Sequence, residues 1–140
     1  MKKVVKFGGS SLASAQHFKK VAEIVHAEAS RRYVVPSAPG KRFRKDTKVT
    51  DMLYGCYALA EQDEDFSDKL AKIQARYNEI INGLGLNLSL DTQFEEIASK
   101  FAAKAGKEYA ASRGEYLNGI IGVLSSIVDN VPLVAGCMGM

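Results

Sequence analysis

The sequence has few of the features that mark secreted, membrane-spanning and metal-binding proteins. Its two cysteines, Cys56 and Cys137, form no metal-binding or redox motif. Such isolated thiols are typical of a reducing cytoplasm, where disulfides are rare. Lys2 and Lys3 are followed by only two apolar residues before Lys6, so we expect no signal peptide. No apolar run approaches the length of about 20 residues that a membrane-spanning helix needs. We therefore expect a cytoplasmic protein with no membrane partner and no metal held by its own side chains.

The chain also lacks internal repeats, low-complexity tracts and a strong charge imbalance. Its 19 Lys and Arg against 16 Asp and Glu give a net charge of +3, too small to require nucleic acid as a partner. A length of 140 residues suits one domain with a real core. The only strongly basic run covers residues 41–48. It fits a solvated surface loop, a loop that attracts a polyanionic nucleotide, or a nucleic-acid contact.

What the chain does have is an informative opening, the stretch KVVKFGGSSL at residues 3–12. The β-forming residues Val4, Val5 and Phe7 predict a buried strand. Gly8-Gly9 predicts a tight turn into a helix over residues 14–30. The free amides at the start of a helix favour an anion such as phosphate, which the ammonium of Lys6 could also reach. Because the lysine precedes the glycines, this is not a Walker A loop. A phosphate site and a plain structural turn both remain open.

A second strand is expected at Tyr33–Val35, which completes a βαβ unit with parallel strands. Ligands of such sheets bind beyond the carboxyl ends of the strands. Gly8-Gly9 and Ser37–Gly40 both fall at that edge. Ser37 could donate its hydroxyl to a substrate, or it could be a simple turn residue before Pro39.

Further polar residues open the helices that follow. Asp46 or Thr47 is expected to cap a helix over residues 49–60, with Thr50 in its first turn. Helical spacing also predicts helices over residues 66–84 and 94–105, an excursion that covers one edge of the site. In the stretch 112–115, Glu115 fits both a capping box and a carboxylate that holds an ammonium group. Arg113 could hold a substrate carboxylate as a bidentate fork. A helix from residue 117 and a last strand at 131–135 complete the prediction.

Four ordered stretches, Lys6–Ser11, Val35–Gly40, Lys48–Leu53 and Ser112–Leu117, together resemble the aspartate kinases of the amino-acid kinase superfamily. The resemblance covers residues 1–119. It implies an α/β three-layer sandwich with a mostly parallel sheet, in an incomplete form. Residues 1–140 would then be the N-terminal portion of the kinase domain, without its nucleotide-binding half and without ACT domains. A fragment, a degenerate homologue and an engineered short version all fit that expectation.

The resemblance also implies a reaction, the ATP- and Mg²⁺-dependent phosphorylation of the L-aspartate side chain that opens lysine, threonine and methionine biosynthesis. It implies little activity for this chain alone. The alternative is a non-catalytic module that binds small anions or amino acids. An unprotected sheet edge would also allow a homo-oligomer. By resemblance, Lys6 is catalytic and holds the nucleotide's phosphates with Gly8, Gly9 and Ser10, while Ser37, Thr50, Glu115 and Arg113 bind aspartate.

Overall fold

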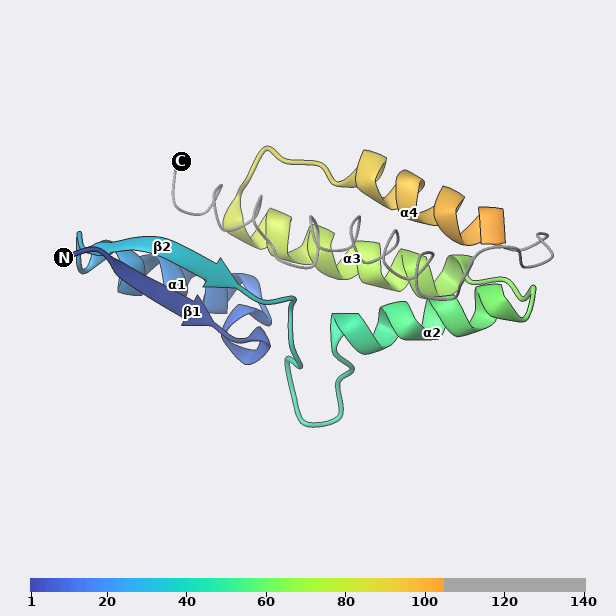
Figure 1. Ribbon diagram of the computed structural model, residues 1–140, viewed down its shortest axis with the longest axis horizontal. Helices are drawn as coiled ribbons and strands as arrows, with labels where there is room; N and C mark the ends of the chain where they lie inside the picture. The colour runs from blue at the N-terminus through green and yellow to red at the C-terminus, as the bar shows by residue number, and fades with distance from the viewer. Residues whose placement is uncertain (105–140) are drawn as a thin grey trace.

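The computed structural model describes residues 1–104 of the chain, as two strands and four α-helices (Figure 1). The predictions that concern Arg113, Glu115, the helix from residue 117 and the strand at 131–135 lie outside the described residues. A short 3₁₀ helix, Gly9–Leu12, follows the first strand. The elements in order are β1 (Lys3–Phe7), α1 (Ala15–His26), β2 (Arg31–Pro36), α2 (Val49–Glu61), α3 (Ser67–Leu84) and α4 (Asp91–Lys104).

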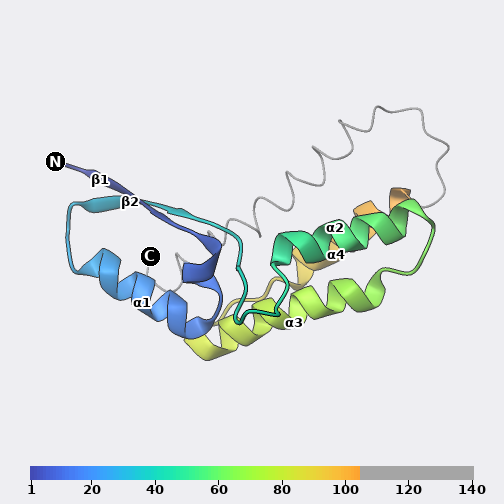
Figure 2. The same ribbon diagram turned by 90° about the horizontal axis from the view of Figure 1, so that it is seen from below.

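The two strands form a parallel sheet in which Val4 pairs with Tyr33 and Phe7 pairs with Pro36. Helix α1 connects them and lies against one face of the sheet (Figures 1 and 2). This arrangement confirms the predicted α/β class and the parallel βαβ unit. Helix α1 ends at His26 rather than near residue 30. The turn that follows is held by Glu28, whose carboxylate accepts a hydrogen bond from the Lys3 ammonium at 2.5 Å.

The two faces of this sheet have different environments. Val5, Phe7 and Val34 pack against the hydrophobic core. On the opposite face Val4 is 68% exposed and its cross-strand neighbour Tyr33 is 53% exposed. The expectation that Val4, Val5 and Phe7 form a buried strand was therefore wrong for Val4, because alternate residues of a strand point to opposite faces.

Helices α2, α3 and α4 pack beside the sheet, and α3 contacts all three of the other helices (Figures 1 and 2). The ring centroids of Tyr77 and Phe94 lie 6.0 Å apart where α3 meets α4. Gly85 ends α3 with a φ of 67°, the left-handed conformation that favours glycine. Within residues 1–104, no helix is long and apolar enough to cross a membrane. The largest buried side chains of the core include Tyr77, Phe18, Phe101, Leu12, Ile73 and Ile97.

Two glycines lie within helices, and replacing each with alanine is expected to change the free energy of unfolding in opposite directions. A Cβ atom on Gly83 would lie 2.6 Å from the Cβ of Ala15, where α3 meets the start of α1. A Cβ on Gly55 would meet only the flexible end of Lys69, at 3.3 Å. We expect Gly83→Ala to lower the free energy of unfolding by about 1–2 kcal/mol through overpacking. Gly55→Ala should raise it by about 0.5–1 kcal/mol through helix propensity.

Urea denaturation of both variants beside the parent chain measures this pair. The prediction is contradicted if the two midpoints shift in the same direction. Combining Ala15→Gly with Gly83→Ala should recover part of the lost stability, because it removes the close contact between the two Cβ atoms.

Candidate functional site

Two loops meet at the carboxyl edge of the parallel strands. The amide of Ser37, after β2, donates to the carbonyl of Phe7 at 3.1 Å, and the amide of Gly40 donates to the carbonyl of Gly9 at 2.7 Å. A Cβ atom on Gly40 would lie 2.5 Å from the carbonyl carbon of Gly9. These two glycines are therefore required by the close approach of the two backbones. A Cβ on Gly8 would have no neighbour within 4 Å, so the described residues leave that side of the turn open.

A cleft of about 600 Å³ lies where these loops meet the start of α2. It brings together four of the predicted site residues from three separate segments, which supports the expectation that the glycine-rich loops share one edge. Ser10 comes from the 3₁₀ helix, Ser37 directly follows β2 and Thr50 comes from the first turn of α2. The cleft is lined by Gly9, Ser10, Ser37, Ala38, Pro39, Gly40, Lys41, Lys48 and Thr50.

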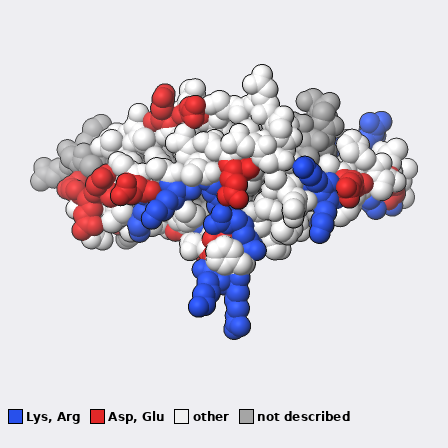
Figure 3. Space-filling model, turned by 180° about the vertical axis from the view of Figure 1, so that it is seen from behind, with Lys and Arg blue, Asp and Glu red and all other residues white. Residues whose placement is uncertain are grey.

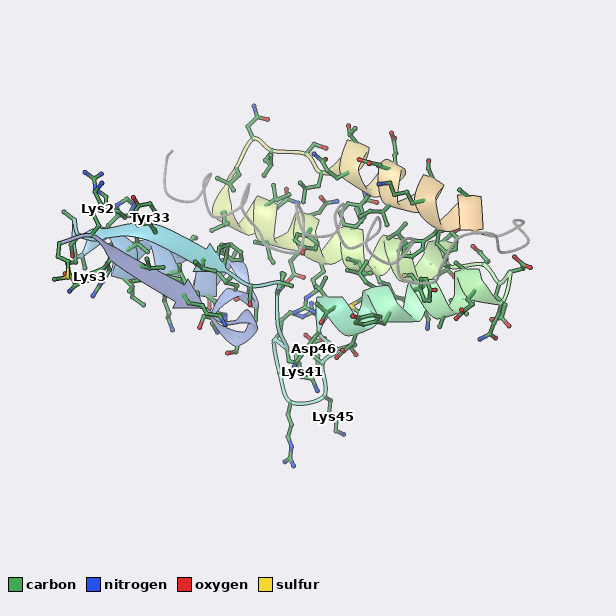
Figure 4. All side chains as sticks on the ribbon, in the orientation of Figure 1. Lys2, Lys3, Tyr33, Lys41, Lys45 and Asp46 are labelled. Carbon is green, nitrogen blue, oxygen red and sulfur yellow. The ribbon has the colours of Figure 1, made fainter. Side chains whose placement is uncertain are left out.

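Lys41 and Lys48 were not predicted as site residues, yet both line this cleft. The signal for them was the basic run at residues 41–48, which the sequence alone left open between a solvated loop and a nucleotide contact. The structure shows a loop with Lys and Arg side chains that protrudes from the body of the molecule (Figure 3). Lys45 lies toward its outer end, away from the cleft lining (Figure 4). Among the described residues no carboxylate lines the cleft, so its two ammonium groups favour an anion.

The start of α2 adds to this positive character. The amide of Val49 donates to the carbonyl of Pro39 at 3.3 Å, which places the first turn of α2 beside the second loop. The N-terminal end of a helix carries a partial positive charge. The N-cap is Lys48 and no side chain caps the helix, so the prediction that Asp46 or Thr47 is the cap was wrong.

The Asp46 carboxylate binds arginine instead of capping α2. The Nε atom of Arg42 lies 2.8 Å from Oδ2, and its Nη2 atom lies 3.1 Å from Oδ1, as a bidentate pair. This hydrogen bonding holds the pKa of the Asp46 carboxyl well below its usual range. Asp46 also raises the pKa of the Arg42 guanidinium. The basic loop is thus folded around an internal ion pair and is not merely extended into solvent.

The remaining predicted residues lie elsewhere. Lys6 is exposed on the open face of the sheet, paired across the strands with Val35, and it does not line the cleft. Gly8 precedes the cleft lining as the residue before the 3₁₀ helix. Glu115 and Arg113 lie outside the described residues.

The donors of this cleft fit phosphate better than a metal ion. Lysine ammonium groups, hydroxyls and a helix N-terminus all bind phosphate oxygens. No cluster of three or more His, Cys, Asp or Glu side chains that could hold a metal occurs in residues 1–104. Any Mg²⁺ at this cleft would therefore have to be coordinated largely by the phosphates of a nucleotide.

Comparison with known proteins identifies the relatives of this fold. No family model matches the chain. Aspartokinase 3 of Bacillus subtilis (strain 168) is 44% identical over 88 residues, which are 63% of this chain and 19% of that protein. The crystal structure of Clostridium acetobutylicum aspartate kinase matches with a TM-score of 0.68 and 45% identity. The chain is homologous to the aspartate kinases.

The extent of the match is as informative as its strength. The structural match covers 89% of this chain but 28% of the Clostridium aspartate kinase. The chain therefore spans less than a third of the length of either aspartate kinase. The predicted resemblance to aspartate kinases is confirmed in sequence and in fold.

Proposed function

We propose that residues 1–140 are the N-terminal portion of an aspartate kinase domain and form the part of its active site that faces L-aspartate and the transferred phosphoryl group. The reaction would convert L-aspartate to 4-phospho-L-aspartate, the first step toward lysine, threonine and methionine. The observation that carries the proposal is the positive cleft at the carboxyl edge of the parallel strands, in a chain homologous to aspartate kinases.

Each part of the cleft has a role in this proposal. Lys41 and Lys48 offset the charge of the phosphate oxygens, while the backbone at Gly9 and the hydroxyl of Ser10 cradle them. Lys6 does not line the cleft, and the resemblance alone assigns it to the same phosphoryl group. The resemblance assigns Gly8 to the phosphate oxygens as well. It assigns four residues to L-aspartate: Ser37, Thr50, Glu115 and Arg113.

The reaction requires the site to position the two substrates and to neutralise their negative charges. The nucleophile is the side-chain carboxylate of aspartate, which is ionised at neutral pH, so no general base is needed. Mg-ATP supplies the phosphoryl group. The residues of the cleft hold the two reacting oxygens close together and lower the repulsion between two anions.

Because the chain spans only part of its relatives, we expect aspartate binding with little turnover. The second candidate is a non-catalytic module that binds amino acids or small anions. It is favoured by the absence of an aromatic side chain from the lining of the cleft among the described residues, since an adenine base commonly stacks on such a ring. Turnover separates the two candidates, and aspartate binding is common to both.

Two assays on the purified chain test the proposal. Calorimetric titration with L-aspartate and with Mg-ATP measures binding, and hydroxamate trapping of the acyl phosphate measures turnover. Lys48→Ala should weaken Mg-ATP binding about tenfold, because one charge-assisted contact is lost. The matched change Lys45→Ala, at a loop position outside the cleft, should alter it less than twofold.

Acyl phosphate that disappears in Lys6→Ala would establish a working kinase site. Aspartate binding without acyl phosphate would favour the binding module and would leave the homology to aspartate kinases standing. A folded chain that binds neither aspartate nor Mg-ATP would contradict both, and salt-sensitive binding of a DNA duplex would then favour a nucleic-acid role for the basic loop.

A further inference from the structure

A buried arginine from another helix holds the loop that carries the two cleft lysines. Arg76 lies on α3 and is 4% exposed. Its Nη1 atom donates to the carbonyl of Thr47 at 2.7 Å, and its Nη2 atom donates to the carbonyl of Gly40. These two carbonyls belong to the residues immediately before Lys48 and Lys41. One guanidinium group therefore fixes both ends of the loop, next to each lysine of the cleft.

An acidic residue inside the loop completes the anchor. Oδ2 of Asp46 lies 3.5 Å from Nη2 of Arg76, on the same carboxylate that Arg42 binds. Burial lowers the pKa of the Arg76 guanidinium and the charge of Asp46 opposes that effect. The group stays charged, because an arginine pKa lies far above neutral pH. A lysine here would keep the charge but lose the planar fork that reaches two carbonyls at once.

The anchor extends to the first glycine loop. The carbonyl of Gly40 accepts from Arg76 while its amide donates to Gly9 at 2.7 Å. A shift of Gly40 would therefore change the spacing of the two loops that wall the cleft. The Nε atom of Arg76 is buried and has no hydrogen-bond partner among the described residues. An unpaired buried donor costs stability, so this arrangement suits a residue that fixes geometry better than one that only stabilises the core.

We infer that Arg76 is a positioning residue of the anion cleft, which sets the separation of Lys41 and Lys48 from a helix that does not itself line the cleft. The part of this inference that concerns anion binding rests on the proposed function. The part that concerns the anchoring of the loop does not, because it follows from contacts within the chain.

The test compares Arg76→Lys with two controls. Arg44→Lys makes the same replacement at an exposed position of the loop. Gly83→Ala destabilises the fold at the contact with Ala15, and neither residue lines the anion cleft. Amide hydrogen exchange is measured at Gly40, Arg42 and Asp46, whose amides donate to Gly9, the Asp46 carboxylate and Phe43. Inorganic pyrophosphate, titrated by calorimetry, is the probe of the cleft.

In Arg76→Lys we expect these loop amides to exchange at least about tenfold faster, with the amides of α1 unchanged. Pyrophosphate affinity should fall at least about fivefold at a temperature where the variant is fully folded. Both quantities should stay within about twofold of the parent chain in Arg44→Lys. In Gly83→Ala, pyrophosphate affinity should also stay within about twofold, although that variant is less stable overall.

Unchanged loop exchange in Arg76→Lys, or an equal loss of protection in every helix, would overturn the inference. If that variant does not fold, the parent chain decides: loop amides that exchange as fast as an unstructured peptide overturn the anchor, and protected ones support it. If the parent chain binds no pyrophosphate, the proposed anion site fails while the exchange measurements still test the anchor.

Discussion

Replacing Gly40 with alanine is expected to lower the free energy of unfolding by about 2–3 kcal/mol. The new Cβ atom would lie 2.5 Å from the carbonyl carbon of Gly9 and 2.7 Å from the amide nitrogen of Ser10. Both are backbone atoms, so no side-chain rotation relieves the contact. The two loops must separate, which also strains the 2.7 Å hydrogen bond from the Gly40 amide to Gly9. Denaturation in urea, with the slope held common to both chains, measures the loss.

Gly8→Ala is the matched control on the same turn. Gly8 has a φ of −76° and a ψ of 170°, which alanine adopts freely, and a Cβ there meets nothing within 4 Å. Its stability should therefore stay within about 0.5 kcal/mol of the parent chain, or rise slightly because the unfolded chain loses freedom. Equal midpoints for Gly40→Ala and Gly8→Ala would contradict the prediction. If Gly8 cradles phosphate as the resemblance implies, Gly8→Ala should weaken Mg-ATP binding without loss of stability.

The local part of this fold could be predicted from the sequence because its signals are local. The β-forming run before Gly8-Gly9, the helical spacing after it and the run that ends at Pro36 predicted a parallel βαβ unit, and the structure confirms it. The edge at which both loops meet followed from the rule for parallel sheets.

The parts that were missed depend on contacts between distant residues. Arg76 lies 36 positions from Gly40, and although its spacing from Ile73 and Ile80 places it on the apolar face of α3, the sequence does not tell which backbone carbonyls it contacts. In the sequence, nothing distinguishes Lys48 from the other basic residues of its loop. The packing of α2 against Pro39 is what places it at the cleft. Val4 was expected in the core because composition does not tell which face of a strand is covered.

Removing the carboxylate of Asp46 is expected to have the second large effect on the free energy of unfolding. We expect Asp46→Asn to lower the free energy of unfolding by about 3 kcal/mol at neutral pH, because it leaves the buried Arg76 guanidinium without its counter-charge. The side chain of Asp46 is 10% exposed and that of Arg76 is 3% exposed, so solvent screens this pair little. Glu79→Gln is the control: Glu79 is 67% exposed, lies 3.3 Å from Arg42, and should contribute less than about 0.5 kcal/mol.

The pH dependence of this difference separates an ionic contribution from simple packing. Hydrogen bonds from Arg42 hold the pKa of Asp46 below its usual value in the folded chain. The carboxylate therefore stabilises the fold fully above the ordinary carboxyl pKa of about 3.9, and this contribution is lost as the pH falls through the lower folded value. The parent chain and Asp46→Asn should differ by a constant amount between pH 5 and 8 and converge below pH 4, by about 1.4 kcal/mol per pH unit. A difference at pH 3, measured by urea denaturation, that is as large as the difference at pH 7 would show that the asparagine disturbs packing and that the charge contributes little. Convergence would show that the loop beside the cleft is held by the ionised Asp46 between its two arginines.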